Sequence, residues 1–299
     1  MGYLRLMVWM IAAACLAGCA VEVGTVVGSQ TPVEAATQEL TVVSVPAGQD
    51  SFIRVYKTVN DTELEAHIFL PPGHVENDQR PVFVFFHGGG WFEGAPENGY
   101  RMCEYWAARG MVAVAFEYRL SDFAAITPVE CLQDAKSAIR WLRIHAVELG
   151  IDPGGIVATG GSAGGHLAVS TAVLEGFEEE GEDWNISSSP DAVIVWSAPV
   201  NLGEDTWFAG LLDDRIDASS LSPADYIRSD LAPMALLHGT ADETVPYWTV
   251  EQFVEDMQRA DNRCELYTYE GGGHLFHVSQ RGHVLGVIEA FLISTGFIE

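Results

Sequence analysis

The sequence predicts an α/β fold in which helices cover both faces of a mostly parallel sheet. Short apolar runs typical of buried strands alternate with helix-length segments along most of the chain. With 299 residues, 48% of them hydrophobic, the chain can bury a large core in one domain. The formal net charge is −27, from 15 Lys+Arg against 42 Asp+Glu. So few cations cannot neutralise many phosphates, which argues against a nucleic-acid partner.

The first two strands are predicted to form an antiparallel hairpin, because the β-like runs 52–58 and 63–70 flank the turn signal Asn60-Asp61. The aromatic and β-branched run 81–86 is typical of a strand buried on both faces. Further strand-like runs follow at 111–116, 155–160, 191–198, 233–238 and 265–269, and helix-like segments at 97–109, 128–149, 162–175, 250–259 and 283–294. This alternation predicts parallel strands joined by helical crossovers. A long irregular insertion is expected only at about 200–231, and the acidic run 175–183 is interpreted as a solvated loop.

The N-terminus is predicted to lie outside the fold. Arg5 precedes an apolar run at 6–16 that is too short to span a membrane comfortably, so residues 1–18 are interpreted as a signal peptide. The ending Leu-Ala-Gly-Cys at 16–19 resembles the bacterial lipoprotein box. That resemblance implies a lipidated Cys19, a tether over 19–39, a folded domain over 40–299, and an outer-membrane lipoprotein of a bacterial cell envelope. A secretory peptide cut nearby, which would give a secreted or periplasmic protein, is the alternative.

A candidate nucleophile follows the strand-like run that ends near residue 160. Residues 160–164 read Gly-Gly-Ser-Ala-Gly, a GxSxG pattern that places Ser162 on a sharp strand-to-helix turn. A helix N-cap is the alternative role of an isolated serine at this position. A serine nucleophile also needs a histidine base oriented by a carboxylate, in the chain order Ser, acid, His.

The candidate acid and base follow two later strands in that order. Asp242 follows the run 233–238, and Glu243 and Asp214 are the competing acids. His274 follows the strand-like run 265–269 and three glycines, with His277 and His283 as competing bases. The predicted catalytic triad is therefore Ser162, Asp242 and His274.

Residues 87–91, His-Gly-Gly-Gly-Trp, follow the strand-like run 81–86 and can present backbone N–H groups to a substrate oxygen. Gly89, Gly90 and Ala163 are the predicted oxyanion-hole donors. Trp91, Phe92, Trp207 and Phe208 are candidates for a substrate pocket, and ordinary packing is the competing interpretation. His87, His166, His238, Arg119 and Asp134 are expected to serve the architecture. The cysteines show no CxxC or Cys/His metal spacing, so no metal site is expected. Acyl transfer by a serine triad requires no cofactor, so none is expected.

These motifs resemble those of α/β-hydrolase carboxylesterases, near the hormone-sensitive-lipase and feruloyl/acetyl-xylan-esterase-like groups. The matching segments are HGGGW at 87–91, EYRL at 117–120, GGSAGG at 160–165, HGTADETVP at 238–246 and GGGHLFH at 271–277. The resemblance implies an eight-stranded α/β-hydrolase fold with a small insertion in place of a full lid. Gly161 stands where the lipase group usually has Asp, and no N-terminal helical cap is evident, which weighs against long-chain lipase activity.

The resemblance implies a serine esterase that uses an acyl-enzyme intermediate. Its expected substrate is a small-molecule or polysaccharide-borne ester with a short-chain, acetyl or feruloyl-type acyl group. An amide hydrolase of the same fold and a non-catalytic binding module are the alternatives.

Overall fold

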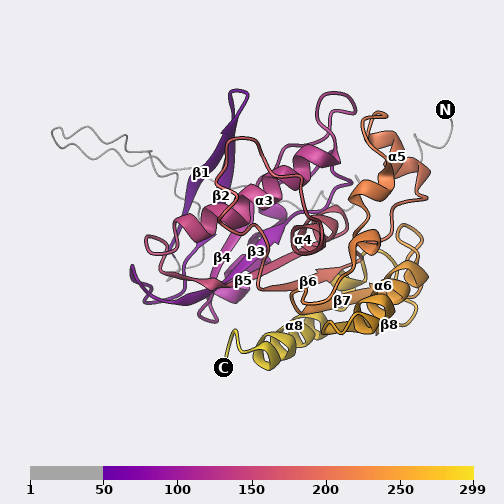
Figure 1. Ribbon diagram of the computed structural model, residues 1–299. Coiled ribbons are helices and arrows are strands. Elements are labelled where there is room, and N and C mark those ends of the chain that lie inside the picture. Colours follow the sequence, from indigo (N-terminus) through magenta and orange to yellow (C-terminus); the bar gives the residue numbers. More distant parts are fainter. Residues whose placement is uncertain (1–49) are drawn as a thin grey trace.

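The computed structural model describes residues 50–299 (Figure 1). The predicted signal peptide, the lipidation site Cys19, the tether and the proposed domain start at residue 40 lie outside these residues. No helix in the described part of the chain is both long and apolar enough to cross a membrane. Cys103, Cys131 and Cys264 are buried free thiols.

The core of the fold is one eight-stranded sheet in the order β1-β2-β4-β3-β5-β6-β7-β8. Its strands are β1 (Ser51–Val59), β2 (Thr62–Phe69), β3 (Arg80–Phe86), β4 (Val112–Phe116), β5 (Ile151–Gly161), β6 (Ala192–Trp196), β7 (Met234–Gly239) and β8 (Cys264–Tyr269). β2 pairs antiparallel with β1 and β4, and the remaining neighbours are parallel. The predicted α/β-hydrolase sheet with an N-terminal hairpin is confirmed.

The hairpin turn has the local chemistry that the sequence predicts. Asn60 and Asp61 adopt φ values of 48° and 62°, the positive φ values that two-residue hairpins need and that Asn and Asp tolerate better than most residues. The turn therefore fixes the register in which Val59 faces Thr62.

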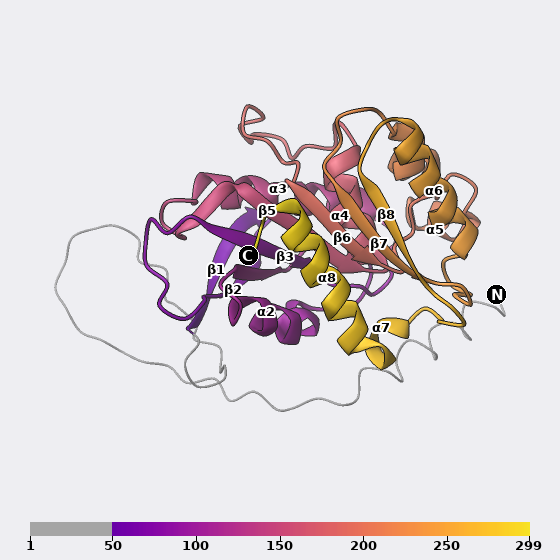
Figure 2. The ribbon, with the colours of Figure 1, turned by 90° about the horizontal axis from the view of Figure 1, so that it is seen from below.

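Helices cover both faces of the sheet. The helices are α2 (Tyr100–Ala107), α3 (Pro128–Ile144), α4 (Ala163–Val173), α5 (Thr206–Leu211), α6 (Tyr247–Arg259), α7 (Phe276–Ser279) and α8 (Arg281–Thr295), with short 3-10 turns η1 (Pro96–Gly99), η2 (Ala218–Leu221) and η3 (Pro223–Tyr226). Side chains of α3, α4 and α6 share one apolar core, and those of α2 and α8 share the other, on the side seen in Figure 2.

The two cores use alternate residues of the same strands. In β3, Val82, Val84 and Phe86 face the first core, whereas Phe83 and Phe85 face the second. Successive side chains of a strand point to opposite faces, so a central strand covered on both sides reads as a continuous apolar run. This explains why the run 81–86 lacks an apolar/polar alternation.

The insertion and the acidic run are more ordered than the sequence predicts. The insertion contains α5, η2 and η3. Within the acidic run, Glu178 pairs with Lys136 and Arg140, and Glu179 pairs with Lys57 and Arg119. The run is a loop, as predicted, and Glu175, Glu180 and Asp183 are exposed. The interpretation as solvated is wrong for Glu178 and Glu179, because these carboxylates neutralise buried cations of α3, of β1 and of the segment after β4.

Candidate active site

Ser162 occupies a sharp turn between β5 and α4. Its φ and ψ are 54° and −126°, a strained conformation for a residue with a side chain. The neighbouring glycines permit this turn because other residues pack too closely against them to leave room for a side chain. A Cβ on Gly161 would lie 2.1 Å from Trp196 Nε1, and a Cβ on Gly164 would lie 2.1 Å from the carbonyl oxygen of Phe86. The turn lifts the Ser162 side chain clear of the sheet.

Ser162, His274 and Asp242 form a continuous hydrogen-bonded line. His274 Nε2 lies 3.0 Å from Ser162 Oγ, and His274 Nδ1 lies 2.9 Å from Asp242 Oδ2. The three residues follow β5, β7 and β8, whose carboxyl ends meet at one edge of the sheet because these strands are parallel. Residues separated by 80 and 32 positions in the sequence are thereby within hydrogen-bond distance.

The Asp242 side chain is held as a buried carboxylate. The backbone N–H groups of Thr244 and Val245 each donate to its Oδ1 at 2.9 Å. Burial raises the pKa of this carboxyl, but the hydrogen bonds from His274 and from the Val245 N–H outweigh burial and leave the pKa below its ordinary value. Asp242 is therefore charged at neutral pH and stabilises a proton on His274 Nδ1.

Residues at the end of β6 form hydrogen bonds with the backbone of both Ser162 and His274. The Ser162 N–H donates to the Trp196 carbonyl at 3.0 Å, and Ser197 Oγ donates to the His274 carbonyl at 2.7 Å. Ser197 is 1% exposed and has a φ of 49°. Nothing in the local sequence marks this residue, because its role depends on a loop 77 positions away.

The glycine loop after β3 packs against the serine turn. A Cβ on Gly88 would lie 3.5 Å from Ser162 Cβ. Gly89 and Gly90 have φ values of 127° and 58°, which a residue with a side chain rarely adopts. Within residues 50–299, the N–H groups of Gly89, Gly90 and Ala163 donate no hydrogen bond, so the amides predicted as oxyanion donors are free to bind a ligand oxygen.

With this geometry in place, comparison with known proteins identifies the family. The BD-FAE family model matches residues 67–257, which include Ser162 and Asp242. The chain belongs to the BD-FAE family. Together with the solved esterase structures described next, this match confirms the family-level prediction of an α/β-hydrolase esterase.

Solved structures of an esterase from Thermogutta terrifontis resemble this BD-FAE chain closely. The apo form of its esterase 2 is 40% identical, with a TM-score of 0.80, and the match covers 85% of this chain and 97% of that one. The same esterase phosphonylated by sarin matches at 39% identity and a TM-score of 0.81, over 85% of this chain and 98% of that one.

More distant curated relatives are also esterases by name. A probable carboxylic ester hydrolase, LipM of Mycobacterium tuberculosis, is 27% identical over 71% of this chain and 54% of its own length. A probable isoprenylcysteine alpha-carbonyl methylesterase of Arabidopsis thaliana is 27% identical over 69% of this chain and 47% of its own length. The BD-FAE chain thus spans about half the length of these curated relatives.

The competing histidines of this BD-FAE chain lie in other surroundings. His277 packs its ring near Trp196, with 5.7 Å between ring centroids, and His283 Nδ1 lies 3.0 Å from the Tyr269 hydroxyl. Burial lowers the pKa of His277 to about 4. Neither ring forms a hydrogen bond with Ser162 or Asp242, so the geometry favours His274 as the base.

The competing acids, Glu243 and Asp214, are exposed and form no hydrogen bond with a histidine. Among the histidines expected to serve the architecture, His166 and His238 bond the carbonyls of Leu221 and Val245. His238 Nε2 also lies 3.4 Å from Asp242 Oδ2, which adds a fourth polar neighbour to the candidate acid.

The four predicted pocket aromatics divide by exposure. Trp91 and Phe208 are 2% and 0% exposed and pack with ring centroids 4.8 Å apart. Phe92 and Trp207 are partly exposed, with centroids 6.5 Å apart. Phe123, which the sequence did not single out, is 52% exposed and packs against Phe92. Phe92, Trp207 and Phe123 are therefore at least partly exposed, whereas Trp91 and Phe208 belong to the apolar core beneath them.

Among residues 50–299 there is no cluster of three or more His, Cys, Asp or Glu side chains that could hold a metal ion. Arg119 and Asp134 form a buried ion pair, with 2.8 Å between Arg119 Nε and Asp134 Oδ2. These two residues serve the architecture, as predicted, and do not reach the serine.

Proposed function

We propose that the protein hydrolyses carboxylic esters through Ser162 as nucleophile, His274 as general base and Asp242 as the orienting acid. The observation that carries this proposal is the hydrogen-bonded line from Ser162 Oγ through both ring nitrogens of His274 to Asp242. With a proton on Nδ1 facing Asp242, the Nε2 lone pair faces Ser162 and can accept its proton.

The reaction proceeds in two acyl-transfer steps. Ser162 Oγ attacks the ester carbonyl carbon while its proton passes to His274 Nε2, and the free N–H groups of Gly89, Gly90 and Ala163 stabilise the oxyanion. The intermediate collapses by breaking the bond to the alcohol oxygen, which takes the proton from His274. Water then attacks the acyl-enzyme by the same route and releases the acid and free Ser162.

The proposed substrates are esters with short acyl groups, including carbohydrate-linked acetyl or feruloyl-type esters. Solved structures of the related Thermogutta esterase 2 contain propionate and butyrate, which supports a short acyl site. The small insertion between β6 and β7 supports an accessible cleft. The net charge of −27 makes uronate-rich polymers poor candidates, since like charges oppose encounter at low salt.

The test compares wild type with Ser162→Ala on p-nitrophenyl esters of increasing acyl length. We expect wild type to hydrolyse short esters and Ser162→Ala to fold normally with no measurable turnover. A fluorophosphonate probe should label wild type at Ser162 and leave the variant unlabelled. Turnover retained by the variant would contradict the proposed nucleophile, and folded wild type without labelling would favour a binding module.

A second panel separates the substrate classes. Acetylated xylan, feruloyl esters, p-nitrophenyl butyrate and formyl or peptide amides are supplied to wild type at equal concentrations. Preference for amides would replace the ester proposal with amide hydrolysis at the same triad. Preference for butyrate over acetyl and feruloyl esters would keep esterase activity and reject the carbohydrate-linked class.

For localisation, we propose an outer-membrane lipoprotein anchored through Cys19. The support is the sequence pattern at 16–20. Mass spectrometry of the protein extracted from membranes should find a diacylated N-terminal Cys19. An unmodified N-terminus at another residue would refute the anchor and favour a secreted or periplasmic protein.

A further inference from the structure

One short segment after β4 holds both ends of the glycine loop. The Tyr118 hydroxyl donates to the His87 carbonyl at 2.8 Å, and the Ser121 N–H donates to the Trp91 carbonyl at 2.7 Å. The two accepting carbonyls flank Gly88, Gly89 and Gly90, so segment 118–121 spans the loop that carries two of the proposed oxyanion donors.

The glycine loop needs such ties because its own backbone is conformationally permissive. Gly89 and Gly90 have positive φ values, and Trp91 follows with a φ of 66°, a region that residues with side chains rarely occupy. Within the loop, the Gly89 carbonyl accepts the N–H groups of Phe92 and Glu93, and His87 Nδ1 lies 2.9 Å from the Gly88 carbonyl. Because glycine has many accessible conformations, the two ends of the loop also have to be held for its amides to keep one direction. An oxyanion hole works only when its donors are held close to the productive geometry.

The contact between Tyr118 and His87 is buried and stacked. Both side chains are 1% exposed, and their rings stack with centroids 4.1 Å apart and planes 15° apart. Burial lowers the pKa of His87 to about 4, so this ring is neutral when it stacks on Tyr118. The only polar atom that Tyr118 contributes is its hydroxyl, and that hydroxyl is used on the loop.

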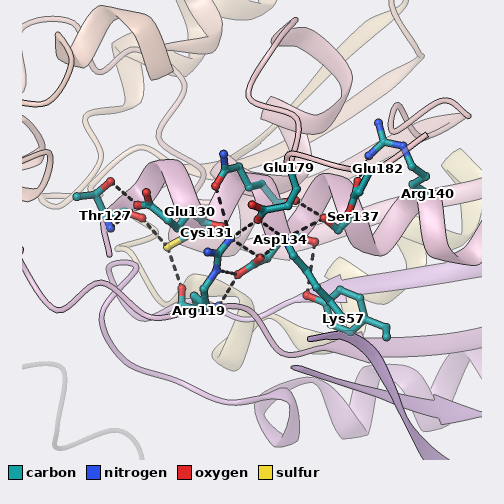
Figure 3. A network of polar contacts seen from close by, with 12 residues as sticks. Lys57, Arg119, Thr127, Glu130, Cys131, Asp134, Ser137, Arg140, Glu179 and Glu182 are labelled. Atoms are coloured by element: carbon teal, nitrogen blue, oxygen red, sulfur yellow. Dashed lines mark hydrogen bonds and ion pairs between the residues drawn. The ribbon is translucent and has the colours of Figure 1, made fainter. Parts of the chain in front are cut away.

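Segment 118–121 is itself fixed by the ion network in Figure 3. Asp134 of α3 accepts hydrogen bonds from the Arg119 backbone N–H and from Arg119 Nε, both at 2.8 Å. Lys57 Nζ lies 2.6 Å from Asp134 Oδ1, and Glu179 lies within 2.7 Å of both cations. The Asp134 side chain is fully buried. The segment is therefore held by buried ion pairs to α3 and β1 as well as by its bonds to the glycine loop.

We propose that Tyr118 is a positioning residue that aims the oxyanion donors through its hydroxyl bond to the His87 carbonyl. This inference rests on the proposed function, since it assigns Tyr118 a role in stabilising the oxyanion of ester hydrolysis. Tyr118 is 1% exposed, and its hydroxyl bonds the His87 carbonyl rather than a triad residue. Its effect passes through the backbone of His87 to the adjacent glycines.

The variant Tyr118→Phe tests the role, because it removes the hydroxyl and leaves the stacked ring. Loss of one oxyanion donor lowers kcat by about 10²–10³-fold, so partial misalignment of two donors should lower it by roughly tenfold. We expect KM for short esters to change little. The Ki of a trifluoromethyl ketone, which forms an oxyanion on the serine, should rise about as much as kcat falls. The pH profile of kcat/KM should keep its wild-type shape, because the triad is intact.

Thr159→Val is the matched control. Thr159 is fully buried, and its hydroxyl donates to the Val84 carbonyl at 2.7 Å, between β5 and β3 and not to residues 87–91 of the glycine loop. Both variants lose one buried hydroxyl-to-carbonyl bond, so similar losses of thermal stability are expected. Only Tyr118→Phe should change kcat and the ketone Ki.

Three results would overturn the inference. They are a kcat of Tyr118→Phe within twofold of wild type, an equal kcat loss in Thr159→Val, and a shifted pH profile that places the effect in the triad. These outcomes are distinct from failure of the proposed function, in which wild type itself would hydrolyse no ester and resist fluorophosphonate labelling.

Discussion

Replacing Asp242 by Asn tests how the buried carboxylate selects the protonation state of His274. Asp242 Oδ1 accepts the N–H groups of Thr244 and Val245, and Oδ2 faces His274 Nδ1. An Asn side chain must keep its oxygen toward the two amides, because the opposite orientation would set its NH₂ against two N–H donors. Its NH₂ then faces His274 Nδ1.

That orientation reverses the tautomer of the histidine. An NH₂ at 2.9 Å requires an acceptor on Nδ1, so the imidazole proton moves to Nε2 and points at Ser162 Oγ, 3.0 Å away. The base then has no lone pair for the serine proton. For a triad acid replaced in this way, kcat falls by about 10⁴-fold, which corresponds to about 5 kcal/mol of transition-state stabilisation. KM should change far less, since Asp242 does not contact the substrate.

The assay is steady-state hydrolysis of a short p-nitrophenyl ester, with circular dichroism to check the fold. Glu243→Gln is the matched control, because Glu243 is the adjacent, exposed carboxylate. It should retain wild-type kcat. If Asp242→Asn kept more than a tenth of wild-type kcat while folded, or if Glu243→Gln lost as much activity, the assignment of the acid would be wrong.

Three further predictions concern the supports of the site. Ser197→Ala and Ser197→Gly should each lower kcat about tenfold, because each variant loses the hydrogen bond to the His274 carbonyl. Ser197 has a φ of 49°, which glycine adopts without strain, so full activity in Ser197→Gly alone would attribute the loss in Ser197→Ala to backbone strain. Burial lowers the pKa of His87 and His166 to about 4, below about 6.5 in the unfolded chain, so stability present above pH 6.5 is lost as pH falls. In urea unfolding, each of these two histidines should lower the free energy of unfolding by about 2 kcal/mol between pH 7.5 and pH 5, and the variant His166→Gln should show a smaller change with pH. Equal urea midpoints of the wild type at pH 7.5 and pH 5 would contradict this prediction. Phe208→Ala should cost about 3–5 kcal/mol of stability, whereas Trp207→Ala should mainly raise KM; the reverse pattern would reject the division of the pocket aromatics.

Much of the fold was predictable because local patterns and the global fold agree. The run 81–86 predicts a strand buried on both faces, and β3 is that strand. Thr127 and Pro128 begin α3 with a side-chain cap and a proline at its first turn, and the structure ends the helix at Ile144 rather than near residue 149. Helix ends depend on tertiary contacts, which the periodic pattern does not contain.

The residues of the candidate site were predictable where short sequence motifs mark them. The strained turn around Ser162 needs small neighbours, and the parallel topology brings the residues that follow β5, β7 and β8 to one edge. The supports of the site were not predictable. Ser197 and Tyr118 donate hydrogen bonds to backbone carbonyls of other loops. Because every residue type has a backbone carbonyl, no sequence motif indicates these contacts.

The sequence by itself determined the fold class, the order of the candidate triad and the glycine loop, because each depends on residue types at fixed spacing. Only the tertiary structure decided which histidine meets Asp242, which aromatics are exposed and what the acidic run does. The sequence pattern predicts solvated charges at Glu178 and Glu179, yet these two residues pair with buried Lys136 of α3 and buried Arg119 after β4. Such pairing depends on distances between segments far apart in the sequence, which the fold alone sets.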